Sequence, residues 1–111
     1  MNDVFMIAAR RTAVAPRDGS FAQIGAADLG AAVIQGVLEK LDLSGAQIDE
    51  VIFGNALYGG GNPARVAALA AGLSETIPAS TIDTQCCSGL DAILFGASRI
   101  RAGEAQIVVA G

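Results

Sequence analysis

The only two cysteines of the chain, Cys86 and Cys87, stand side by side in the stretch TIDTQCCSGLDAILFG, residues 81–96. A cysteine thiolate can act as a nucleophile that holds a substrate fragment covalently. Two cysteines are too few for a disulfide framework or a four-ligand zinc site. The chain has no histidine, the base that most often activates such a thiol. A catalytic thiol here would therefore depend on groups outside these 111 residues.

Three interpretations of the cysteine pair remain open: a reactive thiol, two small buried residues, or a vicinal disulfide. The pair lies where a predicted strand gives way to a predicted helix, the edge at which functional groups of an open parallel sheet gather. The N-H groups at the helix start favour a thiolate and lower a thiol pKa from about 8.5. Free cysteines are often simply buried, and ring strain and a reducing compartment disfavour the disulfide. The position favours a reactive thiol without choosing between Cys86 and Cys87.

The elements that must position this pair are indicated by alternating short apolar runs and segments of helical spacing. The expected strands cover residues 4–9, 51–53, 79–85 and 107–109, and the expected helices cover residues 26–41, 63–71 and 88–102. The order β-α-β-α-β-α-β with short connections predicts an α/β fold with a mostly parallel sheet.

The predicted helix over residues 88–102 is apolar on more than one side. One stripe combines Leu90, Ile93, Leu94, Ala97 and Ile100, and Ala92, Phe95 and Gly96 widen it. A helix enclosed on most sides would offer a dry site to a thiol at its start.

A glycine-rich stretch precedes the predicted helix over residues 63–71. Gly59, Gly61 and Ala64 fit G-x-G-x-x-[G/A], the dinucleotide-binding pattern. That pattern usually follows the first strand of its unit and uses an acidic residue after the next strand. Here the pattern follows the second expected strand, and Asp83 would have to be the acidic residue. The spacing favours a glycine-rich turn that leads into a helix capped by Asn62.

The composition indicates a piece of a larger protein. Hydrophobic residues make up 52 % of the chain and the mean hydropathy is +0.50, which is high for a self-contained domain of this length. No apolar run reaches the roughly 18 residues of a membrane helix, so no membrane association is expected. The start of the chain shows no targeting segment, which predicts a cytoplasmic location with reduced thiols.

The net charge of -4 and the scattered positive residues argue against nucleic acid as a partner. Arg10, Arg11 and Arg17 form the only loose basic group. A solvated surface is favoured over an anion site for these three side chains.

Two motifs together are specific: G-N-x-x-x-x-G-x-N-P-A-R at residues 54–65 and C-x-S-G-L at residues 86–90. With RRTAV near the start and the ADLGAAVI helix, they make the chain resemble the amino-terminal part of the thiolase family. The resemblance covers nearly the whole chain, so residues 1–111 are interpreted as the amino-terminal portion of the thiolase N-terminal domain.

The resemblance implies that Cys86 is the acyl-thioester nucleophile, since it is the first residue of C-x-S-G-L. Its backbone N-H would be a natural oxyanion donor at the helix start. Cys87 falls where members usually carry Gly, Ser or Ala and is interpreted as a tolerated small residue. The sequence departs from the family at Asp83, where asparagine is usual, and at Ala13, which replaces a proline.

Thiolases are built from two similar α/β halves packed face to face, so the resemblance implies that the helix after Cys86 is buried between them. The acid/base cysteine, the histidine, the loop domain that forms most of the coenzyme A pocket and the carboxyl-terminal domain would lie outside this chain. The resemblance further implies a homodimer or homotetramer and no metal or redox cofactor.

The implied function is acyl transfer that makes or cleaves 3-ketoacyl-CoA through a cysteine-bound acyl group, with coenzyme A thioesters as substrates. The chain alone is expected to be inactive and not to fold as a stable monomer. One alternative is a related condensing enzyme, a ketoacyl or hydroxymethylglutaryl synthase. Others are a non-catalytic thiolase-like scaffold and a small binding module complete in itself.

Overall fold

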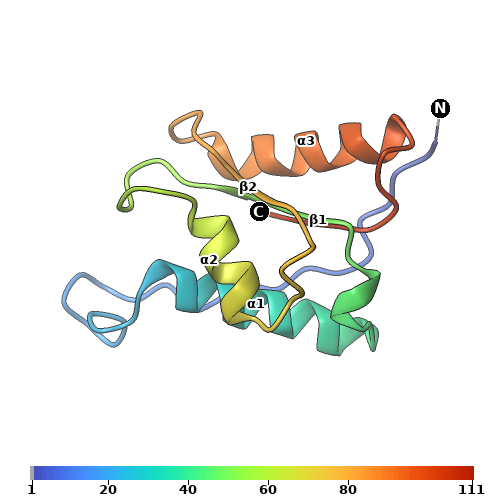
Figure 1. Cartoon of the computed structure of the whole chain (residues 1–111). Coiled ribbons are helices and arrows are strands. Elements are labelled where there is room, and N and C mark those ends of the chain that lie inside the picture. The colour runs from blue at the N-terminus through green and yellow to red at the C-terminus, as the bar shows by residue number, and fades with distance from the viewer. Residues whose placement is uncertain (1) are drawn as a thin grey trace.

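The sheet of this protein has three parallel strands with helices on both faces (Figure 1). It is seen in a computed structural model that describes residues 2–111. The elements in chain order are α1 (Ala26–Leu41), η1 (Gly45–Gln47), β1 (Glu50–Gly54), α2 (Pro63–Ala70), β2 (Ala79–Ile82), α3 (Ser88–Arg101) and β3 (Val108–Ala110). The predicted α/β class and the parallel sheet are confirmed.

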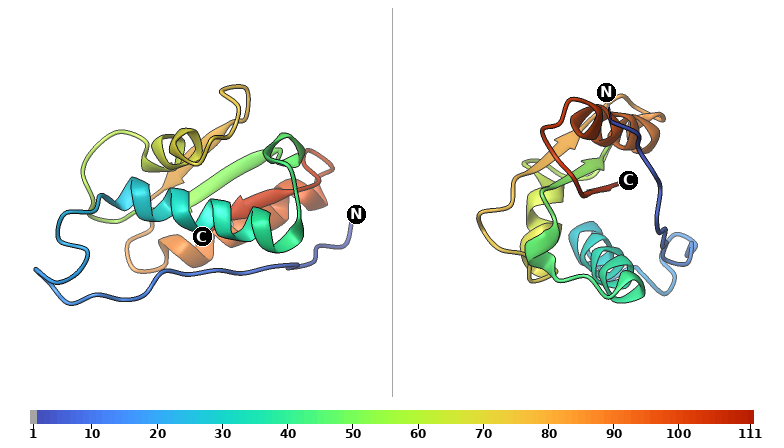
Figure 2. Two further views of the ribbon diagram at one scale, coloured as in Figure 1. Left: turned by 90° about the horizontal axis from the view of Figure 1, so that it is seen from below. Right: turned by 90° about the vertical axis from the view of Figure 1, so that its right-hand side faces the viewer.

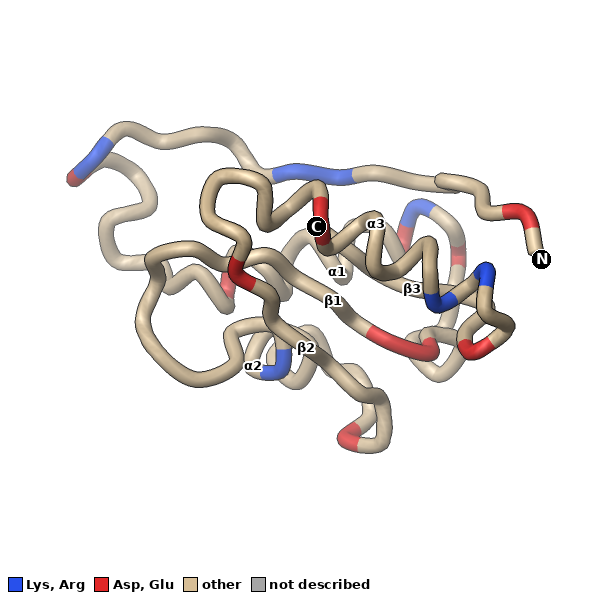
Figure 3. The backbone as a smooth tube through the Cα atoms, turned by 90° about the horizontal axis from the view of Figure 1, so that it is seen from above, with Lys and Arg blue, Asp and Glu red and all other residues tan. Residues whose placement is uncertain are grey.

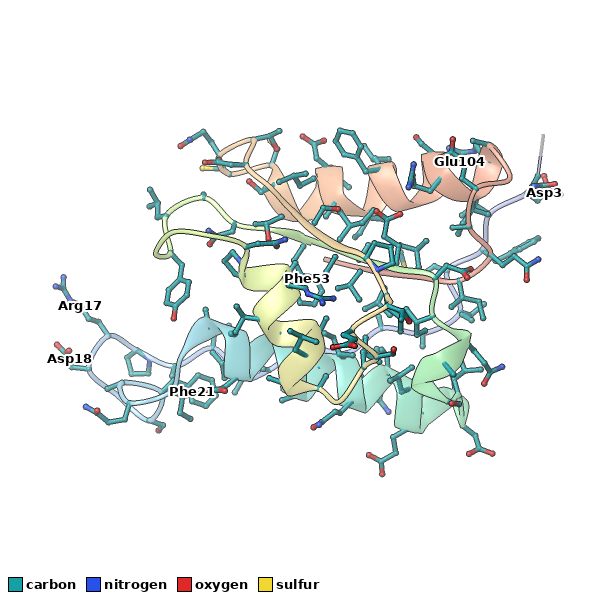
Figure 4. The ribbon with its side chains drawn as sticks, viewed as in Figure 1. Asp3, Arg17, Asp18, Phe21, Phe53 and Glu104 are labelled. Atoms are coloured by element: carbon teal, nitrogen blue, oxygen red, sulfur yellow. The ribbon has the colours of Figure 1, made fainter. Side chains whose placement is uncertain are left out.

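The strand order β2-β1-β3 places β1 in the middle of the sheet, with Val51 paired to Ala79 on one side and Val109 on the other. Helices α1 and α2 cover one face and α3 covers the other (Figure 1). The core lies between β1 and the α1-α2 pair and comprises Ile34, Ile48, Val51, Ala67, Ala68, Leu73 and Ile77. Phe53 points from β1 toward this layer and lies near the centre of the molecule (Figure 4).

The prediction of a strand over residues 4–9 is wrong. This segment runs extended along the open side between α1 and α3, without a ladder partner in the described chain (Figure 2). Phe5, Met6 and Ile7 are exposed, although a covered strand should bury them. A cavity of about 720 Å³, lined by Val4–Arg10 and by apolar side chains of α1, α3 and β3, separates the segment from the sheet.

The small-residue side of α3 faces the sheet. Ser88, Ala92 and Gly96 are its buried residues, and a Cβ on Gly96 would lie 3.0 Å from Val108 Cγ1. The helix can therefore lie this close to β3 only because its small residues face the strand. The predicted stripe is split by this orientation, and its large members Leu90 and Leu94 are exposed together with Phe95.

Charged groups hold the amino edge of the sheet, opposite the cysteines. The buried Glu50 at the start of β1 accepts a hydrogen bond from Arg99 Nε at 2.8 Å. Arg99 also pairs with Glu104, which follows α3 and is labelled in Figure 4. This network joins the last turn of α3 to β1. It fixes that end of the helix, while the site lies at the other end.

Asp49 joins the α3-β3 connection to the start of β1. Its Oδ2 accepts hydrogen bonds from the backbone N-H groups of Gln106 at 2.7 Å and Ile107 at 3.0 Å. The bond from Ile107, and then that from Gln106, lowers the pKa of Asp49. A lowered folded-state pKa means that the stabilisation is present above the unfolded pKa of about 4 and is lost as pH falls through the folded pKa.

We expect Asp49→Asn, made in a full-length protein, to weaken this connection by about 1 kcal/mol at pH 7, because the carboxylate is exposed and screened. Hydrogen exchange should show protection of the Gln106 and Ile107 amides lowered about fivefold. As pH falls from 7 toward 3, wild-type protection should approach that of the variant, while the amides of β2 serve as a control. If the difference in amide protection between the two proteins stayed constant with pH, the Asp49 carboxylate would not be the source of this stabilisation.

Candidate active site

The cysteine pair lies on the turn between β2 and α3, at the carboxyl edge of the parallel sheet. Cys87 is the residue that immediately precedes α3, and both thiols are free and exposed. The predicted strand-to-helix position is therefore confirmed, although β2 ends at Ile82 rather than at residue 85. The interpretation of the pair as buried small residues is wrong for this chain.

A buried hydroxyl holds the turn that carries the cysteines. Ser88 is 5 % exposed, and its Oγ accepts a hydrogen bond from Thr84 N-H at 3.0 Å. The same hydroxyl donates to the carbonyl oxygen of Gln85 at 2.6 Å. Residues 84–88 are thus closed into one frame with Cys86 inside it. In the sequence, Ser88 is noted only as part of the C-x-S-G-L motif. Its place as the first residue of the predicted helix is the one signal that could have indicated that it holds the cysteine turn.

Backbone strain marks the same turn. Gln85 has φ +58°, the left-handed region that non-glycine residues seldom adopt. Asp83 supports this conformation, because its Oδ1 accepts the Gln85 N-H at 2.9 Å. The carboxylate of Asp83 therefore serves the cysteine turn, which argues against a role in holding a ribose at the glycine-rich loop.

Gly54 at the end of β1 permits α3 to begin directly above the sheet. A Cβ at this position would lie 2.4 Å from the Ser88 carbonyl carbon and 2.5 Å from the Gly89 nitrogen. These are backbone atoms, so no side-chain rotation could relieve the contact. The sequence identified Gly54 only as a strand end and a motif letter, and nothing local in the sequence signals this contact.

The glycine-rich loop has a structural explanation. Gly59 and Gly61 adopt φ +53° and +79°, which glycine allows without strain. The first amides of α2 are already used inside the chain, because Asn62 Oδ1 accepts Arg65 N-H at 3.2 Å and Thr81 Oγ1 accepts Ala64 N-H at 3.0 Å. These bonds compete with phosphate binding at the helix start and favour the turn interpretation over a dinucleotide site.

The loose basic group is solvated. Arg10 and Arg11 are exposed, and their guanidinium groups donate only to backbone carbonyls of neighbouring residues in the described chain. Charged residues are scattered over the molecule rather than gathered on one face (Figure 3). Within residues 2–111, no three His, Cys, Asp or Glu side chains gather as metal ligands, and no helix is long and apolar enough to cross a membrane.

Comparison with known proteins identifies the family. The family described as "Thiolase, N-terminal domain" matches residues 4–111. The chain is 50 % identical to an acetyl-CoA acetyltransferase of Pseudomonas aeruginosa, 49 % to one of Cupriavidus necator and 42 % to one of Escherichia coli. Each match covers all of this chain and 29 % of the relative. With this match over almost its whole length, the chain belongs to the thiolase family.

Proposed function

We propose that the full-length protein containing this chain is an acyltransferase that makes or cleaves 3-ketoacyl-CoA through an acyl group held on Cys86. The observation that carries the proposal is the exposed Cys86 thiol on a turn fixed by Ser88 and Gly54, in a chain whose relatives are named acetyl-CoA acetyltransferases. A nucleophile on a rigid strand-to-helix turn can meet a substrate carbonyl in a defined orientation.

In the first half-reaction, the Cys86 thiolate attacks the carbonyl carbon of an acyl-CoA. The carbon-sulfur bond to coenzyme A breaks, and the departing thiolate takes up a proton. The backbone N-H of Cys86 is a candidate donor to the oxyanion that forms between these steps. The acyl group is then held as a thioester on Cys86.

In the second half-reaction, loss of a proton from the α-carbon of another acyl-CoA gives an enolate. The enolate attacks the enzyme thioester, forms the new carbon-carbon bond and releases the Cys86 thiolate. Cleavage is the reverse, with coenzyme A as the acceptor of the acyl group. These steps use a thiolate, two carbonyl groups and proton transfers, so the proposed mechanism assigns no task to a metal or redox cofactor.

The proton transfers require a base from the rest of the protein, since this chain has no histidine. The chain spans 29 % of the relatives it matches, which leaves ample sequence for such groups. The exposed Leu90, Leu94 and Phe95 on α3 are proposed to be covered by the remainder of the same protein. We further propose a homodimer or homotetramer in the cytoplasm.

The test is acid-quenched peptide mass analysis of the full-length protein after exposure to acetyl-CoA. We expect one acetyl group on the peptide that carries Cys86, and the same adduct in a Cys87→Ala variant. The isolated chain should show no thiolysis and should associate rather than remain monomeric. Thiolysis by the full-length protein with acetylation at another residue would overturn the proposal, as would turnover by the isolated chain.

A further inference from the structure

Cys87 is an exposed nucleophile that the proposed mechanism does not use. We propose that Cys86 and Cys87 together form a reversible oxidation site, in which a peroxide oxidises Cys86 and Cys87 closes a vicinal disulfide. The inference rests on the proposed function in one respect: a Cys86 thiolate that an acyl-CoA can reach is also open to a molecule as small as hydrogen peroxide. An accessible thiol beside a second cysteine that can close a disulfide is typical of such sites.

The peptide that must turn when the ring closes is weakly held, and it lies inside a firmly held frame. The Cys87 N-H donates to Thr84 O at 3.4 Å, whereas the next amide, Ser88 N-H, donates to Gln85 O at 3.1 Å. The peptide between the two cysteines is thus held by a long hydrogen bond, so rotating this peptide loses little hydrogen-bond energy. The Ser88 hydroxyl holds the flanking residues at 2.6 and 3.0 Å.

The start of α3 need not change when the ring forms. Cys87 has φ -94° and ψ 2°, outside the helix, and its carbonyl accepts the Asp91 N-H at 2.9 Å. Closing the ring twists the peptide before Cys87, whereas the bond to Asp91 uses the peptide after it. Oxidation should therefore alter the turn and leave the helix in place.

The chemistry balances with hydrogen peroxide as the oxidant. The Cys86 sulfur attacks one peroxide oxygen, the O-O bond breaks and hydroxide leaves, so that sulfur loses two electrons and becomes a sulfenic acid. The Cys87 sulfur then attacks the Cys86 sulfur, the S-O bond breaks, and hydroxide leaves with the Cys87 proton as water. The sum is two thiols and one peroxide giving one disulfide and two waters.

The strain of a ring between adjacent residues is what makes this site reversible. Strained or exposed disulfides are more readily reduced than structural ones, so the pair should rest as thiols and reopen after the oxidant is removed. Without Cys87, a second peroxide would convert the Cys86 sulfenic acid to a sulfinic acid, which ordinary thiols do not reduce. The consequence is protection of the nucleophile at the cost of temporary inactivity.

The experiment exposes the full-length protein and its Cys87→Ser variant to hydrogen peroxide until each loses most of its thiolysis activity, and then adds dithiothreitol. We expect the wild type to recover about fivefold more activity than the variant, whose Cys86 has reached the sulfinic state. Peptide mass analysis before reduction should show the Cys86-Cys87 peptide lighter by two hydrogen atoms in the wild type only. Cys87→Ala repeats the comparison without a hydroxyl.

Equal recovery in wild type and both variants would overturn the proposal, and so would a disulfide from Cys86 to a cysteine elsewhere in the protein. The mass of the Cys86-Cys87 peptide reads out the ring without any activity. If the wild type forms the ring and the Cys86→Ser variant keeps its thiolysis activity, the proposed function is contradicted and the oxidation site is not.

Discussion

Replacing Cys86 by serine should lower kcat for thiolysis by the full-length protein about 10⁴-fold or more, since removal of a catalytic nucleophile leaves only binding and oxyanion stabilisation. A serine hydroxyl is a poor nucleophile without a dedicated base. The oxygen ester that it could form would also release its acyl group to coenzyme A less readily than a thioester. The measurement is steady-state thiolysis together with the acetyl adduct on the Cys86 peptide.

Cys87→Ala is the matched control, since it removes the neighbouring thiol from the same turn. Both cysteines are exposed in this chain, so accessibility alone does not choose between them. If the frame held by Ser88 presents Cys86 to the substrate, Cys87→Ala should keep kcat within about threefold, an effect of under 1 kcal/mol. Equal losses from the two substitutions would contradict the assignment of Cys86.

The elements around α2 could be predicted because their signals are local. Asn62 caps the helix, Pro63 begins it, and Gly72 follows it with φ +89°. Each of these residues favours its conformation through its own backbone or side chain. The strand at residues 51–53 was likewise evident as a short apolar run, and the structure extends it to Glu50 and Gly54.

Two features of the fold could not be predicted because they depend on distant partners. The apolar run at residues 4–9 favours a strand, but a strand forms only when it pairs with a neighbour, and a cavity separates this segment from the sheet, so that it has no ladder partner in the described chain. The spacing on α3 marks both a large and a small apolar side. Only the proximity of Val108 to Gly96 decides that the small side faces the sheet.

The same distinction between local signals and distant partners applies to the candidate active site. A thiol at the carboxyl end of a parallel strand was predictable from Cys86 and the helix that follows it. The contribution of Gly54 was not, because it contacts Ser88, 34 positions later in the chain, only after β1 and α3 have packed. The residues that carry the chemistry were therefore easier to find than the residue that positions them.

Gly54→Ala should displace the start of α3 and reduce activity by more than its loss of stability explains. The added Cβ would lie 2.4 Å from the Ser88 carbonyl carbon, and ordinary carbon-carbon contacts begin near 3.5 Å. The helix start must therefore move by about 1 Å, a displacement that can cost about 10²-fold in rate at a catalytic group. We expect kcat and the rate of iodoacetamide reaction at Cys86, in a Cys87→Ala background, to fall together.

Gly30→Ala provides the comparison that separates positioning from stability. Its Cβ would also be crowded, at 2.9 Å from Ala67 Cβ and 3.1 Å from Phe53 Cε2, but on α1 rather than at the cysteine turn. Overpacking of this kind costs about 1–3 kcal/mol. With both variants assayed at the same interval below their own Tm, Gly30→Ala should keep Cys86 reactivity near the wild-type value and Gly54→Ala should not. Equal Cys86 reactivity in the two variants would mean that Gly54 affects folding alone, and that the geometry of the cysteine turn does not depend on the close contact between β1 and α3.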